Sequence, residues 1–308
     1  MKILILGAGA TGGYYGGRLA ASGADVTFLV RPKRAAQLAA DGLVIDSPHG
    51  NLKTPVKTAT KDTLSGFHDV VILSCKAYDL DHSIEAISPA VGKKTQVLPL
   101  LNGLKHLDAL DEAFGEDRVL GGSCHLSVAL GEDGTVSHLN QLHLLTYGPR
   151  TPSQSELCEA VYPILARARF DTKLSPSVIQ SMWDKWVLLA SLAALTCLFR
   201  ASIGEISNAK GGRDLMLAAI EECRCAAAAA GFEPTAEHMS LIRTLLTDTA
   251  SPVVASMLRD MQRGGPIEGE HIVGDMIGRG QAAGLEMPVL AAAYVNLQCY
   301  QNRLDLSG

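Results

Sequence analysis

A glycine-rich turn near the start of the chain restricts the possible folds more than any other feature. Residues 7–12 read Gly-Ala-Gly-Ala-Thr-Gly, follow a short apolar run at residues 3–6, and lead into a helix-like stretch that ends at Gly23. A second apolar run follows at residues 25–30. Strand, glycine turn, helix and strand in that order begin a right-handed parallel βαβ unit. In this context the GxGxxG pattern predicts a dinucleotide-binding fold.

Each residue of the turn has a distinct expected role in holding a dinucleotide. Gly7 permits the tight turn, Gly9 lets a pyrophosphate approach the backbone, and Gly12 lets the helix pack closely on the strand. Backbone N–H groups of Ala10 and Thr11, at the helix start, favour an anion. The alternative is a tight strand–helix turn that binds no ligand.

The end of the second predicted strand indicates which dinucleotide is bound. NAD-dependent enzymes usually carry Asp or Glu there, bonded to the ribose 2′-hydroxyl. Here Val30 is followed by Arg31, Pro32, Lys33 and Arg34. Three cations therefore stand where a 2′-phosphate would lie, and the forked guanidinium of Arg31 suits such a group. We predict NADP(H) as the cofactor, with a solvated basic loop as the alternative.

The remaining pattern predicts two domains. A chain of 308 residues exceeds the usual size of one hydrophobic core. The first part contains further buried runs at 69–75 and 96–101, a hairpin over 119–147 with its turn at 131–134, a helix at 153–168 and a short strand near 170–174. Later segments look helical, at about 177–200, 211–230, 235–249, 252–263, 266–283 and 288–303. We therefore predict an α/β fold, with an N-terminal Rossmann-type doubly wound sheet in residues 1–173 and an all-α C-terminal domain in residues 174–308.

Composition narrows the classes of partner and the compartment. The net charge of −5 gives no bulk attraction to nucleic acid or to an anionic membrane. The longest apolar run, residues 186–199, is shorter than the ~20 residues that cross a bilayer. Seven cysteines without framework spacing indicate reduced thiols, and no familiar metal-binding motif occurs. We expect a cytoplasmic enzyme without a bound metal, acting on a small molecule. The alanine-rich helices suit either a homodimer face or a tight core.

Three polar residues of the first part are candidates for the ligand site. Lys76 and Asn102 follow the third and fourth buried runs directly. Because the carboxyl ends of parallel strands point into the ligand crevice, both side chains are candidates for contacts with cofactor or substrate. His125 follows a Gly-Gly-Ser-Cys segment that we expect to face the cleft. The alternatives are ordinary strand-end polar residues and a surface or core histidine.

Lys185 is the outstanding residue of the helical part. It lies in the stretch MWDKWVLLASLAALTCLF, which otherwise looks largely buried. A buried lysine is costly without a partner or a function, and burial lowers its pKa toward the range of a general acid. The alternative is a lysine at the rim of the helix that pairs with Asp184 or Asp79.

Glu268 lies in PIEGEHIVGDM, just inside a helix expected to start after Gly264-Gly265-Pro266. A carboxylate there suits catalysis but also suits the helix dipole. Glu270 and Asp275 are competing candidates for the same role.

The chain resembles the ketopantoate reductases nearly end to end. Members of this family reduce 2-dehydropantoate to pantoate with NADPH. The resemblance is carried by GAGATG at 7–12, Arg31, CKAYD around Lys76, LLNG around Asn102, MWDKW around Lys185, SML at 256–258 and the late Glu268. These elements in this order are much more specific than the glycine motif alone.

The resemblance implies a role for each matching residue. Lys185 matches the general acid, and Glu268 matches the acid that assists it and contacts the cofactor. Arg31, Lys76 and Asn102 match cofactor contacts, and Ser256 matches a serine that contacts the substrate. Asn102 and Lys185 would also meet the substrate, with His125 as a further candidate. Hydride would pass to a ketone carbon while Lys185 gives a proton to the developing alkoxide.

Three positions depart from the family pattern and put the substrate in doubt. The family usually has asparagines where this chain has Leu189, Ala193 and Val253. Each lost hydrogen bond to a buried polar group costs ~1–3 kcal/mol. Two substrates therefore stay open: ketopantoate, or a less polar keto acid or ketone.

Two other classes of function also stay open. An NADP-binding sensor without catalysis would not need both Lys185 and Glu268. Opine-type or hydroxyacid-type dehydrogenases share the two-domain plan, but would require a catalytic histidine with a carboxylate partner in the helical half. His238 and His271 are the candidates there.

Overall fold

The computed structural model describes residues 1–307 and divides by its internal contacts into two compact units. The first unit comprises residues 1–101 and 106–178, and the second comprises residues 102–105 and 179–308. The chain therefore enters the second unit for four residues before it returns to the first. The expected domain limit at residue 173 lies five residues before the main division at Val178.

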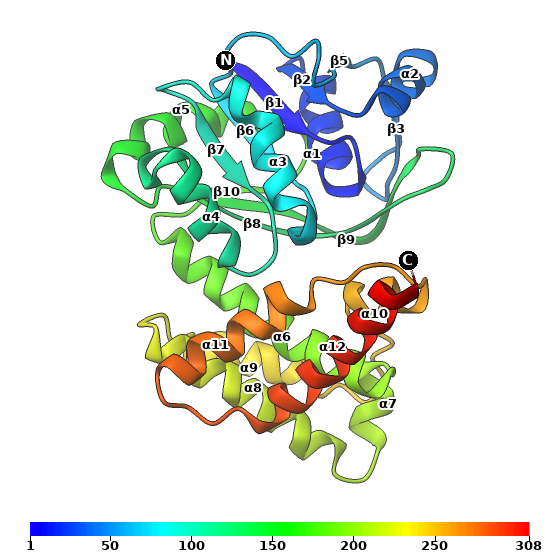
Figure 1. Ribbon diagram of the computed structural model, residues 1–308, viewed down its shortest axis with the longest axis vertical. Helices are drawn as coiled ribbons and strands as arrows, with labels where there is room; N and C mark the ends of the chain where they lie inside the picture. Colours follow the sequence, from blue (N-terminus) through cyan, green and yellow to red (C-terminus); the bar gives the residue numbers. More distant parts are fainter. Residues whose placement is uncertain (308) are drawn as a thin grey trace. The chain divides into compact units, whose positions relative to one another are not determined.

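A parallel sheet forms the first layer of the first unit (Figure 1). Its strand order is β5-β2-β1-β6-β7, and every neighbouring pair is parallel. This is the order of a Rossmann-type doubly wound sheet. Its members are β1 (Lys2–Leu6), β2 (Asp25–Leu29), β5 (Lys57–Ala59), β6 (Val70–Leu73) and β7 (Gln96–Pro99). Pro99 is the last residue of β7, where the missing N–H does least harm to the ladder.

A second sheet contains the predicted hairpin. β8 (Gly121–Leu130) and β9 (Val136–Gly148) are antiparallel, with a register shift between Leu126 and Val128. β9 also pairs with β10 (Thr172–Leu174) and β3 (Leu43–Asp46), and β3 pairs with β4 (Leu52–Thr54). β3, β4 and β5 are not predicted from the sequence, because strands of three or four residues are too short to show a period.

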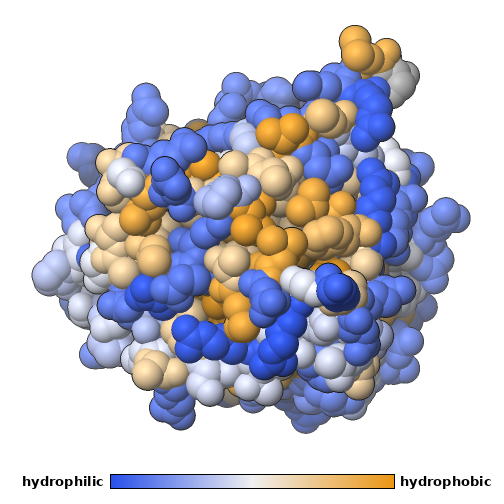
Figure 2. Space-filling view, turned by 90° about the horizontal axis from the view of Figure 1, so that it is seen from below, coloured by the Kyte–Doolittle hydropathy of each residue, from blue (hydrophilic) through white to orange (hydrophobic). Residues whose placement is uncertain are grey.

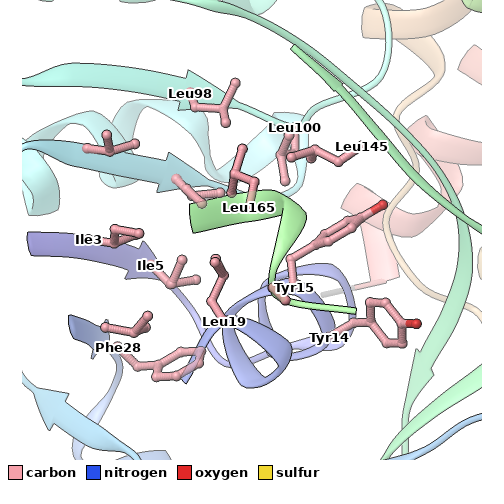
Figure 3. Packing of buried hydrophobic residues seen from close by; sticks show 14 of the residues in the cluster. Ile3, Ile5, Tyr14, Tyr15, Leu19, Phe28, Leu98, Leu100, Leu145 and Leu165 are labelled. Carbon is pink, nitrogen blue, oxygen red and sulfur yellow. The ribbon is translucent and has the colours of Figure 1, made fainter. Parts of the chain in front are cut away.

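Helix α1 (Ala10–Ala21) packs between the two sheets, and its glycines make this possible. A Cβ at Gly16 would lie 2.6 Å from the Phe28 ring of the parallel sheet. A Cβ at Gly17 would lie 2.6 Å from Leu43 of the second sheet. These two consecutive glycines, about 100° apart around the helix axis, therefore allow close approach to a side chain of each sheet. Figure 3 shows the resulting core, in which Leu19 of α1 lies beside Ile5 and Phe28 of the parallel strands, whereas Tyr15 points toward Leu145 of the second sheet.

Four more helices complete the first unit around these layers. α5 packs on the same core through buried Val161 and Leu165. The Tyr147 hydroxyl of β9 donates a hydrogen bond to the Cys158 carbonyl of α5 (2.7 Å), which fixes the helix to the second sheet. The bounds are α2 (Pro32–Asp41), α3 (Leu80–Ile87), α4 (Lys105–Phe114, of which the first residue is grouped with the second unit) and α5 (Ser155–Ala166).

The second unit contains helices and no strand among its described residues. α6 has the length and apolar composition of a membrane span, but 67% of its most apolar stretch is buried inside the protein, as in a core helix. The helices are α6 (Val178–Phe199), α7 (Ile203–Asn208), α8 (Gly212–Ala229), α9 (Ala236–Leu246), α10 (Ser256–Gln262), α11 (Asp275–Ala282) and α12 (Pro288–Ser307), with a π-helical segment at Glu270–Gly274.

Two expected helices of this unit begin later than the sequence suggests. The segment 251–253 hydrogen-bonds to the start of α7, because Ile203 N–H donates to Val253 and Gly204 N–H to Ser251. α10 therefore begins at Ser256 rather than near 252. The helix expected over 266–283 begins with the π-helical segment, and Glu268 lies just before that segment rather than inside a helix.

Candidate active site

The glycine turn has the shape that a dinucleotide phosphate requires. Gly7 has φ +83°, a conformation that favours glycine. A Cβ at Gly12 would lie 2.5 Å from both the Gly7 carbonyl oxygen and Ser74 Oγ, so this glycine is needed for packing. No atom lies within 4 Å of a Cβ at Gly9, which faces open space. The turn is thus closed on the protein side at Gly12 and open to a ligand at Gly9.

Helix α1 presents its N-terminus at this opening. Gly9 is the N-cap residue, and among the described residues no side chain caps the helix. The first-turn N–H groups of Ala10 and Thr11 are therefore oriented toward any anion that approaches. The residues present fit the pyrophosphate of a dinucleotide.

The basic segment after β2 divides into two kinds of cation. Arg31 is the N-cap residue of α2, and both Arg31 and Lys33 are exposed. Arg34 instead donates to the Ala8 carbonyl (3.0 Å) and to the Gly134 carbonyl (3.0 Å). Partial burial lowers the pKa of Arg34. Arg34 therefore joins the glycine turn to the β8–β9 hairpin, and two cations rather than three are exposed for a 2′-phosphate.

Two other candidates belong to the first unit. Lys76 follows β6 and is the N-cap residue of a short 3₁₀ turn at Ala77–Asp79, with a partly buried side chain. His125 lies on β8 and pairs with Leu144 of β9. Its neighbours Cys124 and Leu126 pack against the core, so strand alternation directs His125 to the opposite face.

In the second unit the structure brings Lys185 and Asn102 into direct contact. Lys185 lies in α6 with only 8% of its surface exposed, and its Nζ donates to Asn102 Oδ1 at 3.0 Å. Asn102 follows β7 in the chain, yet its contacts assign it to the helical unit. Two residues 83 positions apart, both selected from sequence, thus form one hydrogen-bonded pair.

His271 lies against the segment that carries Asn102, and the charge of Glu268 acts on His271. Glu268 is 8% exposed and His271 is 7% exposed. Burial lowers the pKa of His271, which the charges of Glu268 and Asp275 and a hydrogen bond to the Asn102 backbone partly oppose. His271 is therefore a neutral imidazole at neutral pH, with a carboxylate close by.

Ser256 is the first residue of α10 and is exposed. The start of α10 is joined to α6, because the Ala255 N–H donates to Thr196 Oγ1 at 3.2 Å. The structure gives no direct contact between Ser256 and Lys185. The other histidine candidate of the helical unit is His238. Its ring hydrogen-bonds to the Asp184 carbonyl at 3.2 Å.

The positions that depart from the family pattern follow Lys185 along α6. Leu189 and Ala193 come four and eight residues later, so they share its face of the helix. Leu189 is partly buried, Ala193 is buried, and Val253 is half exposed. The helix face that extends from Lys185 is therefore apolar.

Lys105 and Tyr294, which bond to the candidate Glu270, were not predicted from the sequence. Lys105 pairs with Glu270 at 2.6 Å, and the Tyr294 hydroxyl also bonds to Glu270. Trp186 Nε1 donates to the Ile272 carbonyl at 2.9 Å. The position of Lys105 directly after the LLNGL segment was the one available signal. Within residues 1–307 no group of histidine, cysteine and acidic side chains is suited to a metal ion.

A glycine turn on a parallel sheet, joined in one chain to a helical unit with a buried lysine, defines a dinucleotide-dependent oxidoreductase. The family model "Ketopantoate reductase PanE/ApbA" matches residues 3–151, and "Ketopantoate reductase PanE/ApbA C terminal" matches residues 177–301. The chain belongs to the ketopantoate reductase family. It is therefore an NADP-dependent oxidoreductase that acts on CH–OH groups.

Relatives and solved structures agree with this assignment. The chain is 36% identical to the uncharacterized oxidoreductase YkpB of Bacillus subtilis (strain 168), over 98% of this chain and 99% of that protein. It is 29% identical to the 2-dehydropantoate 2-reductase of Pyrococcus horikoshii, over 94% of each. The PanE/ApbA family ketopantoate reductase of Ralstonia eutropha JMP134 superposes with a TM-score of 0.89 at 25% identity, covering 99% and 100% of the two chains.

A further solved structure, D-mandelate dehydrogenase with NADH and anilino(oxo)acetate, has a TM-score of 0.88 at 20% identity and covers 99% and 100% of the two chains. At that identity the likeness shows a shared fold.

Proposed function

We propose that this protein reduces 2-dehydropantoate to pantoate with NADPH, and that Lys185 is the proton donor. The contact between buried Lys185 and Asn102 is the observation that carries the proposal. An ammonium group has three N–H donors, so the bond to Asn102 is compatible with another to a ketone oxygen. When bound, the dihydronicotinamide supplies the hydride.

The roles proposed for the chain's own residues follow from their positions. The Lys185 ammonium stabilises the charge that develops on the ketone oxygen, and then transfers a proton to it. Asn102 holds the ammonium through Oδ1. Glu268 supplies a nearby negative charge and a cofactor contact, and Ser256 contacts the substrate. Such preorganised donors typically contribute 10²–10⁴-fold to the rate, by the order of magnitude known for acid–base groups.

Most of the proposed cofactor contacts belong to the first unit. Gly7, Gly9 and Gly12 shape the turn, and the N–H groups of Ala10 and Thr11 receive the pyrophosphate. Arg31 is the proposed contact of the 2′-phosphate. The other proposed cofactor contacts are Lys76 of the first unit and Asn102 and Glu268 of the second unit. His125 is also proposed as a substrate contact. It lies on the face of β8 opposite to the core, because its neighbours Cys124 and Leu126 pack against the core.

A second candidate function is reduction of a less polar keto acid or ketone by the same groups. The observation that favours it is the apolar face of α6, where Leu189 and Ala193 follow Lys185. Two or three lost hydrogen bonds of ~1–3 kcal/mol each would remove most of the preference for ketopantoate. The proton donor and the cofactor site are the same in both functions.

The test is NADPH consumption by the purified protein with ketopantoate at varied concentration, beside a panel of less polar 2-keto and 3-keto acids. Lys185→Ala is the catalytic variant, and Lys210→Ala, an exposed lysine of the same unit, is the matched control. Efficient turnover, above roughly 10⁴ M⁻¹s⁻¹ in kcat/KM, supports the ketopantoate assignment if only Lys185→Ala abolishes it. Turnover of an apolar keto acid alone would favour the second candidate. Tight NADPH binding without turnover of any ketone would indicate a sensor.

A homodimer and a cytoplasmic location also stay predictions. Ala226 and Ala227 of α8 are buried inside the unit, so the alanine-rich segment there serves the core. Leu241 and Leu245 of α9 and Val295 of α12 are exposed and suit a subunit interface better. Figure 2 shows apolar side chains gathered among polar ones on one face. Light scattering of the purified protein tests the homodimer prediction, and a monomer mass at every concentration would exclude a homodimer.

A further inference from the structure

Three successive residues of the π-helical segment Glu270–Gly274 contact the two chain segments that carry Lys185 and Asn102. The Glu270 carboxylate pairs with Lys105 at 2.6 Å. The His271 ring lies against the Asn102–Gly103 segment, where a Cβ at Gly103 would lie 3.4 Å from His271 Cδ2, and it hydrogen-bonds to the Asn102 backbone. The Ile272 carbonyl accepts from Trp186 Nε1 at 2.9 Å, next to Lys185 in the sequence. One short segment therefore holds both sides of the Lys185–Asn102 pair.

The local geometry of the segment makes these contacts possible. A Cβ at Gly274 would lie 2.5 Å from Glu270 Oε2, so the glycine leaves room for the carboxylate to fold back. Tyr294 of α12 donates to that carboxylate, and Lys105 and Tyr294 together lower the pKa of Glu270. Glu270 is therefore ionised and fixed between two partners. Wide π-turns of this kind are frequent at functional sites.

The segment that contains Asn102 lies very close to His271. Gly103 has φ +75°, and a Cβ there would lie 3.1 Å from the His271 carbonyl oxygen and 3.6 Å from Trp186 Nε1. A side chain at this position would push the segment outward. Asn102 therefore depends on close backbone packing as well as on its hydrogen bonds.

We propose that His271 is a positioning residue, which holds the Asn102 backbone so that the Asn102 amide oxygen meets the Lys185 ammonium. Glu270 supports the same segment through Lys105. This inference rests on the proposed proton-donor role of Lys185. A neutral imidazole that donates to the Asn102 carbonyl is hard to replace, because an apolar substitute removes that hydrogen bond.

The test compares His271→Leu with His271→Gln, using ketopantoate or the best ketone of the panel. His271→Leu is expected to lower kcat about 10–100-fold, while the KM values for ketone and NADPH change less than about threefold. His271→Gln keeps a side-chain donor and is expected to restore most of kcat. In a Lys185→Ala background, His271→Leu is expected to cause no further loss, because the group it positions is gone.

Each contrary result overturns the positioning role. Full kcat in His271→Leu, no rescue by folded His271→Gln, or an equal loss in the Lys185→Ala background would each do so while leaving the Lys185 assignment intact. Wild-type turnover by Lys185→Ala would instead refute the proton-donor proposal, and the positioning role with it. If His271→Leu does not fold, Gly103→Ala replaces it, because its Cβ displaces the same segment. Unchanged kcat in that variant would also refute the inference.

Discussion

The two glycines at positions 9 and 12 are expected to respond to an added methyl group in opposite ways. At Gly12 a Cβ would lie 2.5 Å from a backbone oxygen and from Ser74 Oγ, distances that real Cβ atoms do not show. The backbone must then shift, so Gly12→Ala should lower the free energy of unfolding by ~1–3 kcal/mol. At Gly9 the space is open and φ is −82°, which alanine adopts readily. Gly9→Ala should leave the stability of the apo-protein within about 0.5 kcal/mol.

The affinity for NADPH should respond differently from the stability. The methyl group of Gly9→Ala occupies the space through which the pyrophosphate approaches, so we expect NADPH affinity to fall by about tenfold or more. Urea denaturation of the apo-protein, followed by circular dichroism, measures the free energy of unfolding. Circular dichroism is needed because both tryptophans, Trp183 and Trp186, lie in the second unit. Fluorescence titration with NADPH measures the affinity for the cofactor. If Gly9→Ala binds NADPH normally, or unfolds as readily as Gly12→Ala, the assigned roles are wrong.

Three further predictions concern the first unit. Arg31→Ala should raise the KM for NADPH about tenfold but leave the KM for NADH unchanged, since only NADPH carries a 2′-phosphate; equal effects on both cofactors would remove Arg31 from that role. Tyr147→Phe should lower the free energy of unfolding by ~1 kcal/mol in urea denaturation, because it deletes the buried bond to the Cys158 carbonyl, and an unchanged midpoint would contradict this. Burial lowers the pKa of His143, and the charge of His49 lowers it further. Protonation of His143 therefore favours the unfolded chain, so the free energy of unfolding should fall as the pH drops below about 6.5. His143→Gln should weaken that loss between about pH 7 and about pH 5, and an identical pH dependence would count against it.

Sequence periodicity predicted the elements whose burial pattern is strong. The runs at 3–6, 25–30, 69–75 and 96–101 became four of the five parallel strands, and the Gly131–Gly134 turn lies between the two strands of a hairpin. The Rossmann-type fold class is confirmed. The second sheet was only partly foreseen, because β3 and β4 are too short to show a pattern. The packing of α1 between two sheets depends on contacts with Leu43 and Val136, which no local pattern reveals.

The site was predictable as a set of residue types and less so as an arrangement. Lys185 and Asn102 were selected for different reasons, one as a buried cation and the other as a strand-end amide, and the structure joins them. The contacts of Glu270 and His271 could not be inferred, because a π-turn changes which side chains face a neighbour and leaves no mark in the apolar spacing. The hydrogen bond from the Arg34 guanidinium to the Ala8 carbonyl could not be inferred either, because the two residues are 26 positions apart in the sequence.

The brief passage of the chain through the second unit at residues 102–105 affects how this protein can be recombined. A chimera that joins residues 1–178 to the helical unit of a relative would carry a four-residue insert whose partners, Lys185, Glu270 and His271, were left behind. The foreign helical unit would then have to pack against four residues of a different sequence in place of its own. Exchange of helical units should therefore succeed only when residues 102–105 are exchanged with them, although they lie some 70 positions upstream of the main division between the units.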